Sequence, residues 1–257
     1  MLVDTHCHLD PHYFPEGPDA VIARANAAGV GLFVTIGVGR DLEPVRHAVA
    51  LSERRADVWS TVGVHPHEAS TVDDAAFSEI EALASRERVV AIGEIGLDYH
   101  YDRSPREEQR QVFRRFIALA KRVKKPIVIH TREAAADTLA ILEEEGARDV
   151  GGILHCFSED KAFAERALNL DFDISFSGIV TFKTAKAIQE VAAWAPPDRV
   201  LVETDSPYLA PIPFRGKKCE PLHVAVTARF VAGLRGEDEA AFAARTTENA
   251  TKRLRLS

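Results

Sequence analysis

The stretch Val89-Val90-Ala91-Ile92-Gly93-Glu94-Ile95 is an apolar, β-branched run of the kind that forms a buried strand. It is followed by the amphipathic segment Pro105–Lys124 and then by a second apolar run, Pro126–His130. A strand, a helix and a strand in this order indicate a βαβ unit with parallel strands. The same alternation continues along the chain in both directions from this unit.

Eight such runs occur, and eight parallel strands can close into a (β/α)₈ (TIM) barrel of about 250 residues, close to the 257 present here. The main rival is an open doubly wound sheet, but the Gly-rich fingerprint of a Rossmann unit is missing after the first strand. We predict a single barrel domain over residues 1–257, although the length also permits two smaller domains. The predicted strands are Leu2–Thr5, Val30–Val38, Val58–Val64, Val89–Ile95, Pro126–His130, Gly151–Cys156, Phe172–Ser177 and Arg199–Thr204. The predicted helices are Asp41–Arg55, Asp73–Glu87, Pro105–Lys124, Glu133–Glu145, Asp160–Leu170, Lys183–Trp194, Leu222–Leu234 and Asp238–Leu254.

The charge balance is 32 basic against 39 acidic side chains, a formal net charge of −7, which does not attract nucleic acid broadly. A nucleic-acid substrate therefore needs local basic groups and bound cations. Three cysteines, an odd number, are typical of a reducing compartment. The start of the chain lacks a targeting segment, and no apolar run approaches the roughly 20 residues that span a bilayer. We expect a cytoplasmic protein without a membrane partner, for which a monomer is plausible.

Imidazole and carboxylate groups gather at the ends of the predicted strands. In a barrel these ends form one rim, where active sites are built. A single histidine is more often structural than a ligand, but at least five of the ten histidines share this placement with two carboxylates. This donor set suits zinc, manganese, cobalt or magnesium. The side chains concerned are His6, His8, His65, Glu94, His130, His155 and Asp205.

The number of these ligands exceeds what one ion needs. Glu94, on the central fourth strand, could bridge two cations about 3.5–4 Å apart, which would activate a water and stabilise both the attacking and the leaving oxygen. His65 has two interpretations in the sequence Gly63-Val64-His65-Pro66-His67. It either positions the loop or contacts the substrate.

The alternation of side chains along a strand refines two further predictions. Glu203 shares a face with Asp205 and lies about one layer deeper, where a carboxylate can orient ligands or take a proton. Cys7 lies between two of the predicted ligand histidines, and by the same alternation it faces away from them.

At this point the motifs resemble those of TatD-type metal-dependent deoxyribonucleases. The likeness extends from the first strand to the eighth, and five ordered motifs at compatible spacing carry far more weight than a lone His-x-His. The motifs are Asp4-Thr5-His6-Cys7-His8-Leu9-Asp10, Gly93-Glu94-Ile95-Gly96-Leu97-Asp98-Tyr99, Pro126-Ile127-Val128-Ile129-His130-Thr131-Arg132, His155-Cys156-Phe157-Ser158 and Glu203-Thr204-Asp205-Ser206-Pro207-Tyr208-Leu209-Ala210-Pro211, continued by Arg215-Gly216-Lys217.

The resemblance implies two-metal hydrolysis of DNA phosphodiesters, often from a chain end. It also implies that Asp205 handles the proton of the nucleophilic water. The implied ligands are His6, His8 and Asp205 for the first ion, His130 and His155 for the second, and Glu94 for both.

Basic and aromatic residues near these motifs are predicted to contact the substrate. Arg132, Arg215 and Lys217 offer guanidinium and ammonium groups that suit phosphate oxygens. The rings that could stack on bases are those of Phe157, Phe182 and Tyr208, although ordinary packing in the core or in a loop is the more common role for each.

Two positions depart from the family pattern. Cys219 replaces the usual asparagine before Glu220-Pro221, which could weaken loop anchoring or a substrate contact. Glu159 replaces the usual glycine after the His-Cys-Phe-Ser run and adds a carboxylate that would mildly repel phosphate.

Two other functions stay open. Cyclic amidohydrolases use the same barrel on amides, esters or lactones, but they often bridge their metals with a carboxylated lysine where this chain has Glu94. A non-catalytic, metal-stabilised scaffold in nucleic-acid turnover is the third possibility, and an intact ligand set disfavours it.

Overall fold

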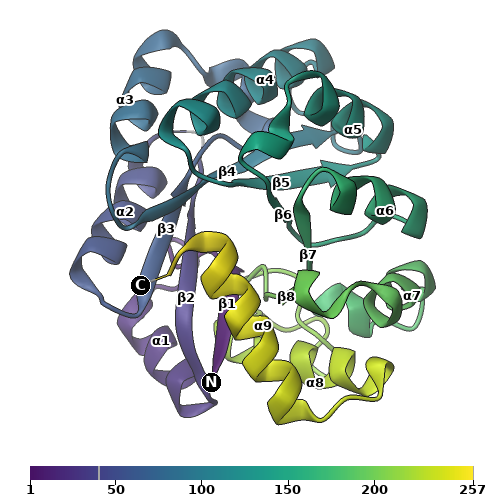
Figure 1. Ribbon diagram of the computed structural model, residues 1–257. Coiled ribbons are helices and arrows are strands. Elements are labelled where there is room, and N and C mark those ends of the chain that lie inside the picture. The colour runs from purple at the N-terminus through teal and green to yellow at the C-terminus, as the bar shows by residue number, and fades with distance from the viewer. Residues whose placement is uncertain (40, 257) are drawn as a thin grey trace. The chain divides into compact units, whose positions relative to one another are not determined.

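The computed structural model describes residues 1–39 and 41–256. The strands follow one another in chain order in an eight-stranded sheet. Their alternation with helices is that of the predicted (β/α)₈ class (Figure 1). The strands are β1 Leu2–Cys7, β2 Val30–Gly37, β3 Val58–Val62, β4 Val89–Asp98, β5 Ile127–Arg132, β6 Gly152–Leu154, β7 Phe172–Phe176 and β8 Val200–Val202.

The predicted helices are present, with ends that differ from the prediction by a few residues. Helix α1 was not predicted, although its buried residues Pro18, Val21, Ile22 and Ala25 have helical spacing. The helices are α1 Pro18–Ala27, α2 Glu43–Arg54, α3 Asp74–Ala84, α4 Arg106–Val123, α5 Ala135–Glu144, α6 Lys161–Asn169, α7 Lys186–Trp194, α8 Val224–Arg235 and α9 Glu239–Leu254. Short 3₁₀ helices are η1 Pro66–Thr71, η2 Ala147–Asp149, η3 Gly178–Thr181, η4 Pro197–Arg199 and η5 Pro221–His223.

The chain divides into two compact units, and the candidate ligands fall into both. The prediction that residues 1–257 form one domain stays a prediction, and its last residue lies outside the described part. The first unit comprises Met1–Thr35, His155–Ala164 and Asp173–Ser257, and the second comprises Ile36–Leu154 and Glu165–Phe172.

In the first unit, α9 packs beside β1 and β8 and closes the apolar face behind them (Figure 1). Phe33, Phe176 and Phe242 are fully buried in this core. Burying a phenylalanine side chain contributes roughly 1.5–3 kcal/mol. Buried aromatic rings in this core therefore stabilise the strands that carry ligands in this unit.

In the second unit, α4 packs on β4 and covers it with Phe113, Phe116 and Ile117, spaced three and four residues apart. Strand β4 pairs with β5, and Gly96 lies opposite His130. A Cβ at Gly96 would lie 2.0 Å from the carbonyl oxygen of His130, and the backbone φ of +138° disfavours other residues. Glycine is thus required where β4 approaches a ligand strand.

Among the described residues, no helix combines the length and the apolar character that crossing a membrane requires.

Candidate metal centre

The pairing of β1 with the segment after β8 brings three predicted ligands of the first unit together. The backbone N–H of Asp205 donates to the carbonyl of His6 at 2.9 Å, and the N–H of His8 donates to the carbonyl of Ser206 at 2.8 Å. Asp205 has a φ of +57°, a left-handed conformation that costs about 1–3 kcal/mol in a non-glycine residue and is concentrated at functional sites. The hydrogen bonds to His6 and His8 hold its backbone in this conformation.

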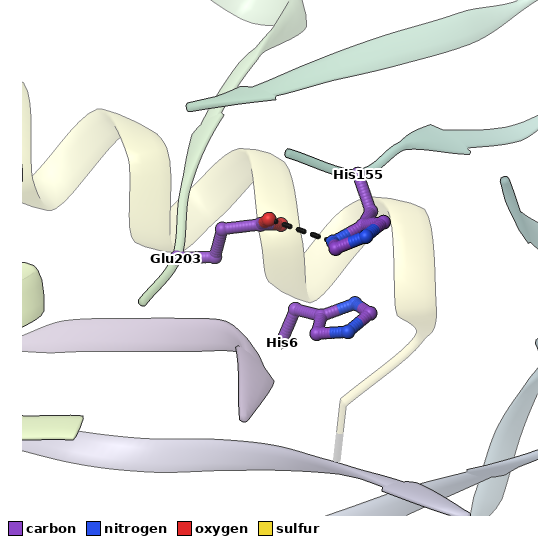
Figure 2. A group of neighbouring side chains, drawn as sticks. All are labelled: His6, His155 and Glu203. Atoms are coloured by element: carbon purple, nitrogen blue, oxygen red, sulfur yellow. Dashed lines mark hydrogen bonds and ion pairs between the residues drawn. The ribbon is translucent and has the colours of Figure 1, made fainter. Parts of the chain in front are cut away.

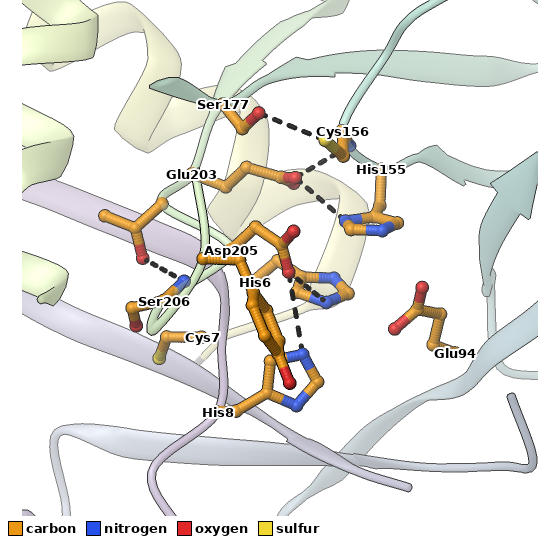
Figure 3. Close-up of polar contacts among 12 residues, drawn as sticks. His6, Cys7, His8, Glu94, His155, Cys156, Ser177, Glu203, Asp205 and Ser206 are labelled. Carbon is orange, nitrogen blue, oxygen red and sulfur yellow. Dashed lines mark hydrogen bonds and ion pairs between the residues drawn. The ribbon is translucent and has the colours of Figure 1, made fainter. Parts of the chain in front are cut away.

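The side chains of these residues then converge on one small volume (Figure 3). Oδ1 of Asp205 lies 3.7 Å from Nε2 of His6 and 3.6 Å from Nε2 of His8. These separations are too long for hydrogen bonds. The three donor atoms lie within 4.8 Å of one another, so a single cation can reach all three. Two imidazoles and a carboxylate are the donor set that zinc and similar divalent ions accept.

The protonation of Asp205 fits the same role. Burial acts to raise its pKa, but the imidazoles of His8, His155 and His6 outweigh burial and hold the pKa below its ordinary value. The carboxylate is therefore anionic at neutral pH, the form that binds a cation.

His155 and Glu203 extend this group within the first unit (Figure 2). Nδ1 of His155 lies 2.9 Å from Oε1 of Glu203, which also accepts the N–H of Cys156 at 2.7 Å. The His155 ring stacks on that of His6, with centroids 3.7 Å apart.

Glu203 also supplies an observation that tests whether a cation fits here. The residue is fully buried, and its Oε2 has no hydrogen-bond partner among the described residues. A buried carboxylate oxygen without a partner is costly unless a cation or a proton neutralises it. His6, His155 and Glu203 place one donor atom each within 4.8 Å of one another, so the residues fit a bound ion.

Asp4 is a site residue to which the sequence interpretation gave no role. It is buried, accepts the N–H of Thr204 at 2.9 Å and its hydroxyl at 2.6 Å, and burial raises its pKa well above the ordinary value. The bonds tie β1 to the residue before Asp205. Cys7 is buried and donates to the carbonyl of Val34 at 3.4 Å, away from the ligand group as predicted.

The second unit holds a separate group made of His65, Glu94 and His130, whose donor atoms also lie within 4.8 Å of one another. Oε1 of Glu94 lies 3.0 Å from Nδ1 of His130 and 3.5 Å from Nε2 of His65. Nδ1 of His65 accepts the N–H of His67, so its ring both caps η1 and faces the carboxylate. His65, predicted to contact the substrate or to position the loop, thus lies where a metal ligand would.

Both nitrogens of His130 face carboxylate oxygens. This arrangement shows whether a cation would fit in the second unit. Nδ1 faces Glu94, and Nε2 lies 3.1 Å from Oδ2 of Asp98. A neutral imidazole has one N–H, so it can donate to only one of the two. Glu94 and Nδ1 of His130 would hold a cation that neutralises this carboxylate, and Nε2 would then donate its proton to Asp98.

Asp98 is the second site residue that the sequence interpretation missed. It is buried, its Oδ2 also lies 3.0 Å from Nε2 of His67, and its Oδ1 accepts the N–H groups of His100 and Tyr101. Burial acts to raise its pKa, but the hydrogen bonds from His130 and His67 hold the pKa well below its usual range. The carboxylate therefore orients His130, as the partners of metal-binding imidazoles commonly do.

We expect Asp98→Asn to weaken divalent metal binding at the second group by about 10- to 100-fold, the usual effect of losing such a partner. The amide keeps an acceptor for the loop N–H groups but loses the charge that holds His130. Competition with a chromogenic chelator measures the affinity directly. Asp102→Asn, an exposed carboxylate of the same loop paired with Arg106, is the matched control. Equal affinity in both variants and the natural chain would contradict the orienting role.

The predicted substrate contacts fall into two places. In the second unit, Arg132 is exposed at the end of β5, with its guanidinium 4.8 Å from the centre of the Tyr101 ring. In the first unit, Arg215 and Lys217 are exposed, and Arg215 lies 4.4 Å above the ring of Phe182.

The three rings predicted to stack on bases differ in exposure. Phe157 is buried against Phe163 and Phe176, so it packs in the core, the more common of the two roles considered for it, and does not stack on bases. Phe182 is half-buried under Arg215, whereas Tyr208 is 48% exposed and lies edge-on to His8.

The two departures from the family pattern lie in different surroundings. Cys219 is buried and its N–H donates to the carbonyl of Pro207, so the loop is anchored there through the backbone. Glu159 is half-buried, and burial followed by the neighbouring Asp160 raises its pKa.

Imidazole and carboxylate groups at the strand ends of a (β/α)₈ fold define the class of the protein as a metal-dependent hydrolase. The family described as TatD related DNase matches residues 3–255, and the chain belongs to this family. It is 43% identical over 257 residues to the metal-dependent hydrolase YabD of Bacillus subtilis (strain 168), covering 100% of both chains. It is 34% identical over 254 residues to the 3'-5' ssDNA/RNA exonuclease TatD of Citrobacter koseri, covering 96% of each.

A solved structure confirms the fold. The TatD homologue YjjV of Escherichia coli K12 superposes with a TM-score of 0.92 at 28% identity, over 100% of this chain and 98% of that one. The predicted barrel class and the predicted metal-dependent hydrolase are both confirmed at the level of the family.

Proposed function

We propose that this chain hydrolyses phosphodiester bonds of single-stranded nucleic acid, with DNA as the substrate and divalent cations as cofactors. The convergence of His6, His8 and Asp205 on one small volume carries the proposal. The family and the exonuclease name of the Citrobacter koseri relative support the choice of bond. Free thiols at all three cysteines support a reducing compartment, and we place the protein in the cytoplasm on that ground.

The ligands we assign come from both units. His6, His8 and Asp205 would hold one cation, and His65, Glu94 and His130 would hold another. When bound, such ions lower the pKa of water and polarise a phosphoryl oxygen. That Glu94 serves both ions, and that His155 binds the second, stay predictions from the family resemblance. Zinc, manganese, cobalt and magnesium are the candidate metals.

The protein side chains have defined parts in the reaction. Asp205 is anionic at neutral pH because the neighbouring histidines hold its pKa below the ordinary value, so its carboxylate can take the proton of the attacking water. Glu203 fixes the ring of His155 through Nδ1 and so leaves Nε2 directed away from it. Arg132, Arg215 and Lys217 are exposed cations that can bind phosphate oxygens.

A substrate panel tests the proposal. Metal-loaded protein should degrade single-stranded DNA and a small phosphodiester such as bis(4-nitrophenyl) phosphate, and it should leave lactone and cyclic amide substrates intact. Asp205→Ala protein purified in parallel excludes a contaminating nuclease. Turnover of the lactone or amide without phosphodiester cleavage would replace this function by the amidohydrolase alternative, and no turnover on either class would favour a scaffold.

A further inference from the structure

Tyr101 and two arginines form an exposed cluster in the second unit, and only one of the three, Arg132, has been given a part in the reaction so far. The Tyr101 side chain is 50% exposed. The guanidinium carbon of Arg132 lies 4.8 Å from the centre of its ring, and that of Arg103 lies 5.4 Å from it. Both distances are within the range of a cation–π interaction. The ring thus holds two positive charges near one another at the surface.

Neither arginine of this cluster is neutralised within the part of the chain that the structure describes. Arg103 and Arg132 make no ion pair and no hydrogen bond to a carboxylate among residues 1–39 and 41–256. The neighbouring arginines differ, because Arg106 binds Asp102 through two nitrogens and Arg110 binds Glu107. A guanidinium over a ring keeps its N–H donors for another partner.

The carboxylates that surround the cluster are already engaged elsewhere. Asp98 is held by two histidines, Asp102 by Arg106, and Glu133 by His100 at 2.7 Å. Two like charges held close together repel unless an anion lies between or beside them. The cluster is therefore prepared for an anion from outside the chain.

The cluster also lies beside the second ligand group. Arg132 follows His130 by two residues on β5, and the Tyr101 ring lies 5.4 Å from that of His67, which contacts Asp98. A phosphodiester chain whose reacting phosphate lies at His130 would bring its next phosphate close to this position. Successive phosphates are a feature of a polynucleotide that a small phosphate ester lacks.

We propose that Arg103, Tyr101 and Arg132 form a binding site for a backbone phosphate of single-stranded nucleic acid, next to the phosphate that is cleaved. The site selects polynucleotide over mononucleotide or small ester substrates. It rests on the proposed phosphodiesterase function and adds to it a separate site for the phosphate next to the reacting one.

The test is binding of a fluorescently labelled, phosphorothioate-linked single-stranded oligonucleotide, measured by anisotropy over a series of salt concentrations. Arg103→Ala and Arg132→Ala should each weaken binding by about ten-fold, the loss of one charged hydrogen bond. Each should reduce the slope of log K against log salt by about 0.7, the value for one phosphate contact on a single strand. Arg103→Lys should keep the slope, and metal content should stay that of the natural chain in all variants.

Arg229→Ala is the matched control, because it removes the same charge from an exposed arginine paired with Glu239 on α8 and α9. Natural affinity and slope in both cluster variants, or an equal loss in Arg229→Ala, would overturn the phosphate site. The outcome is separable from hydrolysis. Binding that depends on Arg103 without cleavage of unmodified DNA would sink the proposed function alone, and cleavage with natural binding in Arg103→Ala would sink this site alone.

Discussion

Replacing Asp205 by asparagine is expected to lower kcat/KM on single-stranded DNA by about 10³-fold, equivalent to about 4 kcal/mol of transition-state stabilisation. The carboxylate is the anionic member of the group with His6 and His8, and its Oδ1 is the atom that faces both rings. An amide keeps the size of the side chain but loses the negative charge. It can neither hold a cation as strongly nor take a proton from water.

The same substitution should also remove metal from the first group. Metal content per chain, measured by plasma emission spectrometry, should fall while the melting temperature changes little. Asp198→Asn, an exposed carboxylate of η4 in the same unit, is the control and should leave both kcat/KM and metal content unchanged. An Asp205→Asn protein with natural kcat/KM would remove this residue from the reaction.

Exhaustive removal of metal by a chelator is expected to have the second large effect on the rate of DNA hydrolysis. Dialysis against a strong chelator should reduce DNA hydrolysis to below about one part in a thousand, because bound cations supply several kcal/mol of charge stabilisation. Addition of zinc, manganese, cobalt or magnesium should restore it, and the best ion of the four identifies the functional metal under those conditions.

We expect chelation to remove activity without unfolding the protein. The cores of both units are packed from apolar side chains such as Phe176 and Phe116, so circular dichroism should be the same before and after chelation. Undiminished activity in protein shown to be free of metal would reject a cation-dependent mechanism.

The fold was predictable from local patterns because strands and helices alternate along the whole chain. Each predicted strand has a counterpart, although β8 is only Val200–Val202 and β4 extends to Asp98. The end of β4 differs because residues beyond an apolar run continue a ladder when a partner strand is present. Asp98 pairs with Arg132, which the pattern of apolar residues alone cannot indicate.

The candidate ligands were predictable because strand ends in this fold carry the chemistry. The carboxylates that support them were harder to find. Asp98 follows Glu94 by four residues on one strand, so the alternation of side chains contained its signal. Asp4 shares the alternation of His6 and His8 on β1, but its contact with Thr204, two hundred residues away, has no local signal.

For Phe157 the sequence left two roles open, base stacking and core packing. Its place after His155 suggested a ring near the substrate, but its N–H donates to Ser175 and its side chain enters the core. Burial of a single ring depends on how a turn is directed, and Cys156 sets that direction with a left-handed φ of +45°.

The central claim is that cations are bound by these histidines and carboxylates, and anomalous diffraction from crystals of metal-loaded protein tests it most directly. Data collected above and below the absorption edge of the bound metal should give a peak about 2.0–2.2 Å from nitrogen atoms of His6 and His8 and an oxygen of Asp205. A second peak should lie among His65, Glu94 and His130. Anomalous peaks elsewhere, with neither group occupied in metal-saturated crystals, would contradict the account.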